Sequence, residues 1–214
     1  IRYTTSHPKD MTSDLINCHK FSKKLVPFIH LPIQSGSNKI LKSMNRKHSR
    51  EEYLNIIKNL VSVRPGIKFS SDFIIGYPGE TEKDFEDTLS LINNVKFINS
   101  FSFIFNQRPG TPAFKLNPLN KDVQQNRLII LQNLLSNIQS EYNKSKIGKI
   151  IKVLIENKMK NQNKYFGRTD CFTPVITENI DDKDVGKIIN VKIKNSNRNT
   201  LFGIKEEIKD EVAA

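Results

Sequence analysis

Cysteine is scarce in this sequence of 214 residues, which contains only Cys18 and Cys171. The two lie too far apart for a Cys-x-x-Cys metal or redox site, so we interpret them as structural or incidental thiols of a reducing compartment. No apolar run approaches the roughly 18 to 20 residues that a membrane-spanning helix requires. The sequence therefore predicts a soluble, cytoplasmic protein without a membrane partner.

Other signals are missing as well. The N-terminus lacks the basic and apolar segments of a signal peptide. It begins with Ile1 inside a strand-like segment, and we expect the sequence to be a fragment of a longer protein. The glycine-rich loop from Gly76 to Gly79 lacks the Lys-Ser/Thr pair of a phosphate-binding P-loop. It also lacks the G-x-G-x-x-G spacing of a dinucleotide-binding fold.

Negative charge is low relative to positive charge, with 22 acidic against 34 basic residues and a formal net charge of +12. Residues 1–70 hold 13 basic and 4 acidic side chains, residues 71–146 hold 8 of each, and residues 147–205 hold 12 and 6. Two positive regions favour a nucleic-acid partner. A lysine excess that only reflects A/T-rich coding is the alternative, and charge alone does not decide.

The most informative stretch runs from Phe69 to Thr81. An apolar, β-rich segment ends at Gly76-Tyr-Pro-Gly79, which must turn the chain, and Thr81 is a predicted helix N-cap. This β-loop-α unit has glycines at which backbone amides can approach a ligand closely. A plain connecting turn is the alternative.

Similar units recur along the first two thirds of the chain. Strand-like segments at residues 1–5, 28–33, 68–75 and 100–105 alternate with helical patterns, which favours a parallel sheet. Helices are expected over residues 14–25, after the capping box Ser49-Arg-Glu-Glu52 as far as Arg64-Pro65, and over residues 122–146, with Val123, Leu131 and Leu135 facing inward.

A polar loop follows each predicted strand, at residues 6–8, 34–37, 76–80 and 106–111. The carboxyl ends of parallel strands share one edge, so we expect the loops to converge on one site. Four independent turns are the alternative. His30, at a strand end, is interpreted as a hydrogen-bonded residue in preference to a metal ligand.

From Ile147 onward the pattern is that of a small antiparallel β-barrel. Short strands are expected over residues 150–155, 165–170, 173–176 and 187–194. Such a basic barrel either handles nucleic acid or packs on the first domain. Tyr165 and Phe166 are candidates for base stacking or for the barrel core, and we favour the core. The predicted domains are residues 1–146 and 147–214.

Four segments in order carry a family resemblance: HLPIQSGS at 30–37, ILKSMNRKH at 40–48, DFIIGYPGET at 72–81 and RPGT at 108–111. They resemble the radical SAM methylthiotransferases, and look most like the branch that modifies tRNA adenosine. The resemblance covers essentially the whole chain, since the C-terminal part is similar to a TRAM RNA-binding domain.

The resemblance implies the C-terminal βα repeats of a partial (β/α) radical SAM barrel, followed by the TRAM-like β-barrel. It implies S-adenosylmethionine and two [4Fe-4S] clusters in the parent protein. Through a 5′-deoxyadenosyl radical, such enzymes add a methylthio group to carbon 2 of an N6-modified adenosine beside the anticodon. The implied partners are the tRNA anticodon stem-loop and an electron donor. The alternatives are the sister branch that modifies a ribosomal protein, and a non-catalytic RNA-binding remnant.

The resemblance also assigns residues by motif. The cluster-ligating cysteine run of the family is absent, so the fragment alone is expected to be inactive, and no catalytic or metal-binding residue is assigned. The predicted cofactor-binding residues are Gln34, Ser35, Ser37, Asp72, Ile75, Gly76 and Gly79. The predicted RNA-binding residues are Arg46, Lys47, Arg108 and Arg168.

Overall fold

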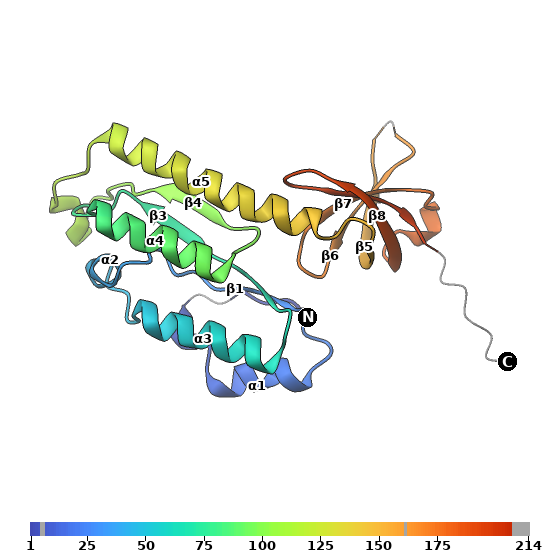
Figure 1. Cartoon of the computed structure of the whole chain (residues 1–214), viewed down its shortest axis with the longest axis horizontal. Helices are drawn as coiled ribbons and strands as arrows, with labels where there is room; N and C mark the ends of the chain where they lie inside the picture. The colour runs from blue at the N-terminus through green and yellow to red at the C-terminus, as the bar shows by residue number, and fades with distance from the viewer. Residues whose placement is uncertain (5–6, 161, 207–214) are drawn as a thin grey trace. The chain divides into compact units, whose positions relative to one another are not determined.

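The computed structural model describes residues 1–4, 7–160 and 162–206. The chain divides into two compact units, residues 1–138 and 139–214, each with its own hydrophobic core (Figure 1). Helix α5 (Lys121–Lys144) contributes residues to both units. The domain boundary that the sequence suggests, at residues 146 and 147, falls just beyond this helix, whereas the two units divide inside it.

Short strands and helices alternate in the first unit. In chain order they are α1 (Ser13–Phe21), β1 (Phe28–His30), α2 (Asn38–Ser43), α3 (Arg50–Val63), β2 (Lys68–Ser70), β3 (Asp72–Ile75), α4 (Glu82–Val95) and β4 (Phe101–Ile104). β1 pairs with β2 and β3 pairs with β4, both in parallel. Isolated parallel bridges join Gln34 to Phe73 and Thr4 to His30. The predicted βα alternation and parallel pairing are confirmed.

The strand expected over residues 68–75 is broken at Ser71. Side chains take over hydrogen bonds there: the Ile33 amide donates to Ser71 Oγ at 3.0 Å, and the Ser71 amide donates to Ser100 Oγ at 3.0 Å. The strand expected over residues 1–5 appears only as the bridge at Thr4, and residue 5 lies outside the described residues. α1 ends at Phe21, earlier than the expected 25.

The predicted helix starts are confirmed. Ser49 and Glu52 form a reciprocal capping box at the start of α3, and Thr81 forms another with Asp84 at the start of α4. α3 ends at Val63, two residues before Pro65, because the residue preceding a proline is disfavoured in helical geometry. Across the described residues, none of the helices combines the length and apolar character needed to cross a membrane.

The core of the first unit lies on one face of β3. Side chains alternate along a strand, so Phe73 and Ile75 are buried in this core, while Asp72 and Ile74 are half-buried on the opposite face. Leu131 and Leu135 of α5 join the same core, as expected. Val123 does not: it is 39% exposed, because this turn of α5 packs on the first unit through the neighbouring residues Gln124 and Arg127.

The second unit is a closed five-stranded barrel, which confirms the expected small β-barrel. Its strand order is β5-β6-β7-β9-β8. Pairing is antiparallel except between β7 and β9, which are parallel. Tyr165 is 2% exposed and belongs to the core, as favoured. The strands are β5 (Ile150–Lys158), β6 (Tyr165–Thr169), β7 (Pro174–Glu178), β8 (Ile188–Ser196) and β9 (Leu201–Lys205).

β9 was not among the predicted strands, although Leu201-Phe-Gly-Ile-Lys205 has the alternation of a half-buried strand. It closes the barrel, which needs every backbone edge paired. Gly203 is required there, since a Cβ at this position would approach the Lys192 carbonyl oxygen to 2.6 Å.

Candidate cofactor site and RNA-binding surface

A cavity of about 670 Å³ lies where the loops after β1, β3 and β4 come together. This is within the size range of small-molecule sites in proteins. Gln34 follows β1, Asp72 and Ile74 belong to β3, and Phe103 and Asn106 come from β4 and the loop after it. Three of the four predicted loops therefore converge. The fourth, at residues 6–8, includes residue 6, which lies outside the described residues, and its His7 is not among the lining residues.

The backbone at Gln34 is what brings this loop to β3. Gln34 has a φ of +78°, a left-handed conformation uncommon for residues other than glycine. Its amide donates to the Asp72 carbonyl and its carbonyl accepts from the Ile74 amide, both at 2.9 Å. Such conformations persist where surrounding structure holds them and cluster at ligand sites. This geometry keeps Gln34 beside Asp72 at the cavity wall.

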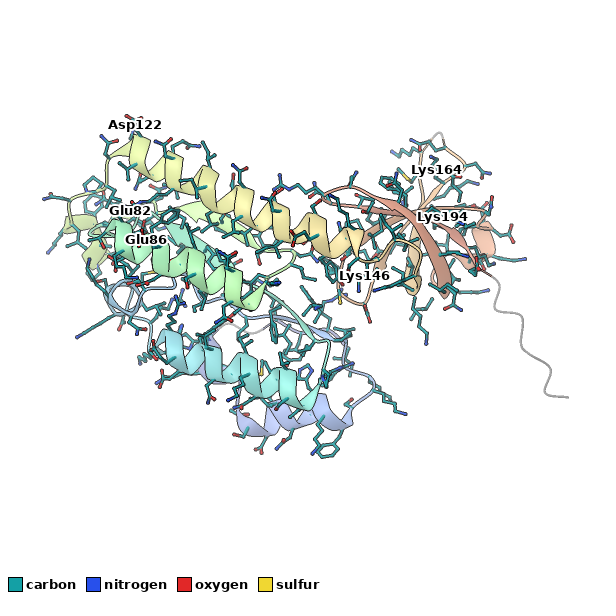
Figure 2. All side chains as sticks on the ribbon, in the orientation of Figure 1. Glu82, Glu86, Asp122, Lys146, Lys164 and Lys194 are labelled. Carbon is teal, nitrogen blue, oxygen red and sulfur yellow. The ribbon has the colours of Figure 1, made fainter. Side chains whose placement is uncertain are left out.

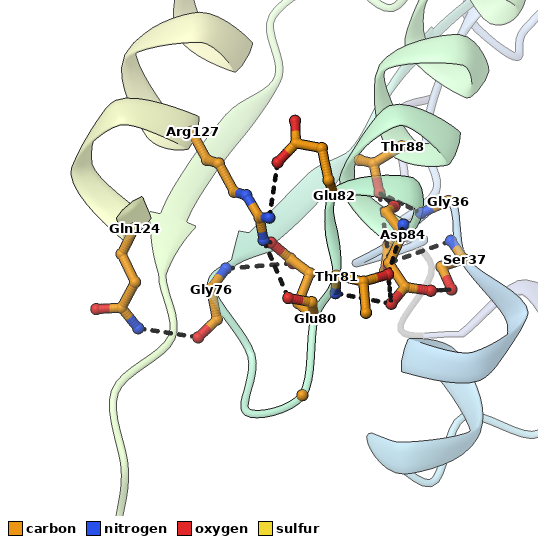
Figure 3. A network of polar contacts seen from close by, with 12 residues as sticks. Gly36, Ser37, Gly76, Glu80, Thr81, Glu82, Asp84, Thr88, Gln124 and Arg127 are labelled. Carbon is orange, nitrogen blue, oxygen red and sulfur yellow. Dashed lines mark hydrogen bonds and ion pairs between the residues drawn. The ribbon is translucent and has the colours of Figure 1, made fainter. Parts of the chain in front are cut away.

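Helix α5 holds the Gly76–Glu80 loop through a buried ion pair (Figure 3). Arg127 donates to Glu80 Oε1 at 2.7 Å and to Glu82 Oε2 at 2.9 Å. Glu80 also accepts from the Gly76 amide at 3.2 Å, and Gln124 donates to the Gly76 carbonyl at 2.9 Å. Burial raises the pKa of Glu80, and the Arg127 hydrogen bond opposes that shift. The loop beside the cavity is thus fixed from both of its ends.

Asp84 joins the loop after β1 to the start of α4 (Figure 3). Its carboxylate accepts from Ser37 Oγ at 2.6 Å, from Lys39 Nζ at 2.8 Å and from the Thr81 amide at 2.8 Å. Burial alone would raise the pKa of Asp84, but the hydrogen bonds from Lys39, Ser37 and Thr81 hold it well below its usual range. Asp84 therefore stays ionised and keeps the two loops together.

The predicted cofactor-binding residues occupy different places. Gln34 and Asp72 line the cavity. Ser35 and Ser37 are buried and bonded to the protein itself: Ser35 Oγ accepts from the Ser37 amide at 3.2 Å, and Ser37 bonds Asp84. Ile75 is 1% exposed and packs in the core on the other side of β3. The structure does not bring these three side chains to the cavity.

The two predicted glycines differ in setting. Gly76 has a φ of +75°, and a Cβ there would meet the Gln124 side chain at 2.5 Å. Gly79 has a φ of +82° in open space and is exposed. Both need glycine for conformation, and only Gly76 needs it for packing. Their contact with a cofactor stays a prediction.

Several lining residues were missed by sequence reasoning. Tyr77 and Phe105 stack edge to face with ring centroids 4.7 Å apart. Met44 packs against the small apolar cluster that contains Tyr77. Phe103 is 55% exposed on β4, which lies beside β3 in register Ile74 to Phe103. The period-2 alternation of residues 101–104 could have indicated one outward face, but not which ligand it meets.

His30 lies at the end of β1 below the cavity. Its Nδ1 is 2.7 Å from Ser70 Oγ, and its Nε2 is 3.5 Å from Asp72 Oδ2. The expected hydrogen-bonded role is confirmed. His30 therefore lies beside the Asp72 carboxylate at the cavity wall.

The predicted RNA-binding residues are spread over both units. Arg46 and Arg108 line the cavity, and Lys47 is an exposed neighbour of Arg46. Burial lowers the pKa of Arg46. Arg168 lies in β6 of the second unit, where other cations such as Lys164 and Lys194 project from the surface (Figure 2). RNA contact by the four residues stays a prediction.

Two family models match the chain. Residues 3–92 match the radical SAM superfamily, and residues 144–205 match the TRAM domain. The chain thus combines part of a radical SAM domain with a TRAM domain. Across 94% of this chain and 50% of the other, the fold is similar to coproporphyrinogen III oxidase from Escherichia coli, described as a radical SAM enzyme, with a TM-score of 0.51 at 11% identity.

Curated relatives narrow the family. The tRNA-2-methylthio-N(6)-dimethylallyladenosine synthase of Pelagibacter ubique (strain HTCC1062) is 56% identical over all of this chain and 48% of its own length. The synthase of that name from Wolbachia pipientis subsp. Culex pipiens (strain wPip) is 50% identical over 95% of this chain and 47% of its own length. These similarities confirm the predicted resemblance to the radical SAM methylthiotransferases. It spans about half the length of the curated relatives it matches.

The family implies S-adenosylmethionine and iron–sulfur chemistry. The cavity suits the nucleoside part of S-adenosylmethionine, because the apolar faces of Ile74 and Phe103 lie beside the polar groups of Gln34, Asp72 and Asn106. Ligand sites in proteins commonly combine an apolar wall with a few polar groups that fix orientation.

An iron–sulfur cluster does not fit the residues present. Among those that the structure describes, no group of three or more His, Cys, Asp or Glu side chains is placed to hold a metal ion. Cys18 is exposed on α1 and Cys171 is buried in the second unit, and two thiols are fewer than the ligands that such a cluster requires.

Proposed function

We propose that the protein of which this sequence is part is a tRNA methylthiotransferase that adds a methylthio group to carbon 2 of an N6-modified adenosine beside the anticodon. The observation that carries the proposal is the 56% identity to a synthase of that modification over the whole of this chain. A cytoplasmic site of action, an electron donor and the tRNA anticodon stem-loop are parts of the same proposal.

In this proposal the first unit binds and orients S-adenosylmethionine. When bound together with an iron–sulfur cluster, S-adenosylmethionine supplies the radical chemistry of the reaction. The Asp72 carboxylate accepts a hydrogen bond from a ligand hydroxyl or amine, and the side-chain amide of Gln34 binds a second polar group of the ligand. Ile74 and Phe103 exclude water from one side of the cavity.

The loops need little rearrangement for this role. Arg127 holds the loop after β3, and Asp84 holds the loop after β1. Both do so through hydrogen bonds that involve a charged group, which are stronger than hydrogen bonds between neutral groups. Arg46 and Arg108 line the cavity, and in this proposal they contact RNA phosphate, since guanidinium groups match phosphate geometry. Residues from two motifs thus serve a ligand and a nucleic acid at one opening.

The test uses the whole gene product, purified without oxygen and reconstituted with iron and sulfide. It is incubated with S-adenosylmethionine, a reductant and tRNA that carries N6-dimethylallyladenosine, and the nucleosides are analysed by mass spectrometry. We expect a new nucleoside heavier by one methylthio group in place of one hydrogen. An unmodified tRNA, together with a methylthiolated ribosomal protein in a parallel reaction, would support the sister branch and contradict the proposal.

A further inference from the structure

Two phenylalanine rings and an arginine form a stack at the edge of the β6–β7 hairpin in the second unit. The Arg168 guanidinium carbon lies 4.8 Å from the Phe166 ring centroid and 4.7 Å from the Phe172 ring centroid. Phe166 and Arg168 are on the outer face of β6, because Tyr165 and Gly167 point into the barrel. We call Phe166, Arg168 and Phe172 the aromatic stack.

The charge of Arg168 is already compensated. Its guanidinium donates to Glu156 of β5, and the two side chains are 31% and 30% exposed. Asp170, two residues along the chain, adds a further acidic group on this edge. Phosphate is therefore not the ligand that the stack favours. An uncharged flat group is, since a guanidinium and aromatic rings both present π faces.

The backbone of Phe172 is in a conformation that is unfavourable for a residue with a side chain. Its φ is +66°, in the left-handed region that glycine and asparagine populate at this kind of hairpin turn. Its amide donates to the Thr169 carbonyl at 3.0 Å, and the Thr169 amide donates to the Thr173 carbonyl at 3.1 Å, which closes the turn.

Packing of the ring in the barrel core does not offset this strain. Phe172 is 43% exposed and is absent from the core cluster of the second unit. A strained aromatic residue that lies outside the core, with an exposed ring, is typical of a recognition site. The turn therefore presents an exposed ring in a backbone conformation that glycine would adopt without strain.

The surface around the aromatic stack is apolar across several strands. Phe166 is in register with Ile176 of β7, which is in register with Phe202 of β9. On the other side, Arg168 is in register with Leu154 of β5, which is 41% exposed. A half-exposed apolar face of this kind, in a unit with an excess of basic residues, matches the platforms on which unpaired bases stack.

We propose that the aromatic stack is a platform for one unpaired nucleotide base of the RNA, with Phe172 as the ring that the base covers. This inference rests on the proposed function, because it takes the partner to be tRNA. It assigns Arg168 to stacking, with its charge held by Glu156, in place of the phosphate contact expected from the sequence.

The experiment measures binding of the whole 214-residue chain to a synthetic anticodon stem-loop RNA and to a fully paired RNA of the same length. Phe172→Gly removes the ring and suits the left-handed backbone. We expect a melting temperature equal to or above that of the wild type, and affinity for the stem-loop reduced roughly 5- to 100-fold, the effect of losing one stacked base. The slope of affinity against salt should not change, since no charge is removed.

Phe21→Ala is the matched control, because Phe21 is a 75% exposed ring on α1 of the other unit, and its loss should leave the affinity unchanged. Phe172→Trp supplies a second readout, because the chain has no tryptophan. We expect its fluorescence to be quenched by the stem-loop and not by the duplex.

The outcomes separate the two proposals. A wild-type chain that binds no stem-loop RNA would contradict the tRNA partner, and the inference with it. Wild-type binding that Phe172→Gly leaves unchanged, or Phe172→Trp fluorescence that the stem-loop does not quench, would overturn the aromatic stack alone. Equal loss of stem-loop and duplex binding would also overturn it, since a duplex offers no unpaired base.

Discussion

Each unit contains an arginine that pairs with a glutamate and lies over phenylalanine, but in opposite environments. The Arg127 and Glu80 side chains are 8% and 2% exposed, and the Arg127 guanidinium carbon lies 5.3 Å from the Phe85 ring centroid. The Arg168 and Glu156 side chains are each about a third exposed, next to two rings. The same chemical groups thus fix a loop when buried and form a surface when exposed.

The difference follows from desolvation. Removing one partner of a buried pair leaves an uncompensated charge in a poorly solvated place, whereas water solvates the remaining partner of an exposed pair. The buried pair therefore matters to the stability of the cavity loops. The exposed pair is worth little to folding, which leaves its side chains available for a ligand.

The largest effect is expected from Arg127→Met. The substitution leaves the Glu80 carboxylate buried without its cationic partner. It should therefore lower the free energy of unfolding of the first unit by about 3 to 5 kcal/mol. Urea denaturation followed by circular dichroism measures this change. Adding Glu80→Leu should restore most of the loss, because two apolar residues replace the pair. Arg168→Met should cost at most about 1 kcal/mol.

Lys83→Met provides the control for loss of a surface cation. The Lys83 side chain is 76% exposed and pairs with Asp87 one helical turn away, so its replacement should leave the free energy of unfolding essentially unchanged. Equal effects of Arg127→Met and Arg168→Met would contradict the comparison between the two pairs.

A pH effect should be confined to the first unit. Burial, with His7 and Arg46 nearby, lowers the pKa of His48 to about 4. An unfolded histidine takes up a proton below about pH 6.5, whereas folded His48 does so only near 4, so acid favours the unfolded state between these values. We expect a loss of about 1 to 3 kcal/mol as pH falls through this window.

His48→Phe should flatten part of that slope, with a remainder from His7 and His19, whose pKa values burial also lowers. Asp84 acts in the same direction only at lower pH, because its folded pKa lies below its ordinary value of 3.8. An unchanged slope in His48→Phe between pH 4 and 6.5 would argue against a buried neutral His48.

Local signals in the sequence account for the parts of the fold that depend on neighbouring residues. The capping boxes at Ser49 and Thr81 give the helix starts, and proline marks the end of α3. The pairing of Glu80 with Arg127, in contrast, has no local signal in the sequence. Arg127 lies 47 residues away, and nothing near either residue indicates the pairing. The break at Ser71 likewise depends on Ser100, and the closure of the barrel by β9 depends on strands distant in sequence.

The same limit explains the candidate site. Motif positions predict that the loops after the strands carry the site, and Gln34 and Asp72 do line the cavity. They do not reveal that Ser37 is tied to Asp84, or that Ile75 points into the core, because both follow from three-dimensional packing. Nor does the run Asp170-Cys-Phe-Thr173 show that the backbone of Phe172 is in the left-handed region.

A smaller effect is expected at the cavity. Asp72→Asn in the whole gene product should weaken S-adenosylmethionine binding by about 1 kcal/mol, roughly fivefold, because a charge-assisted hydrogen bond becomes a neutral one. Isothermal titration calorimetry measures it. Glu86→Gln, an exposed acid on α4 away from the cavity lining, is the control. Equal affinities of Asp72→Asn and the wild type would remove Asp72 from the proposed cofactor site.

The smallest effect separates phosphate contacts from stacking. Lys47→Ala or Arg108→Ala should each weaken stem-loop RNA binding modestly and lower the slope of log affinity against log salt by about 0.7 to 0.9, the value for one released counterion. Phe172→Gly should also lower the affinity, but by the same factor at every salt concentration, so that the slope does not change. Binding measured from low to physiological salt distinguishes them. If Phe172→Gly changed the slope as Lys47→Ala does, the second unit would hold phosphate at this edge, and the contrast between the two arginine pairs would lose its functional meaning.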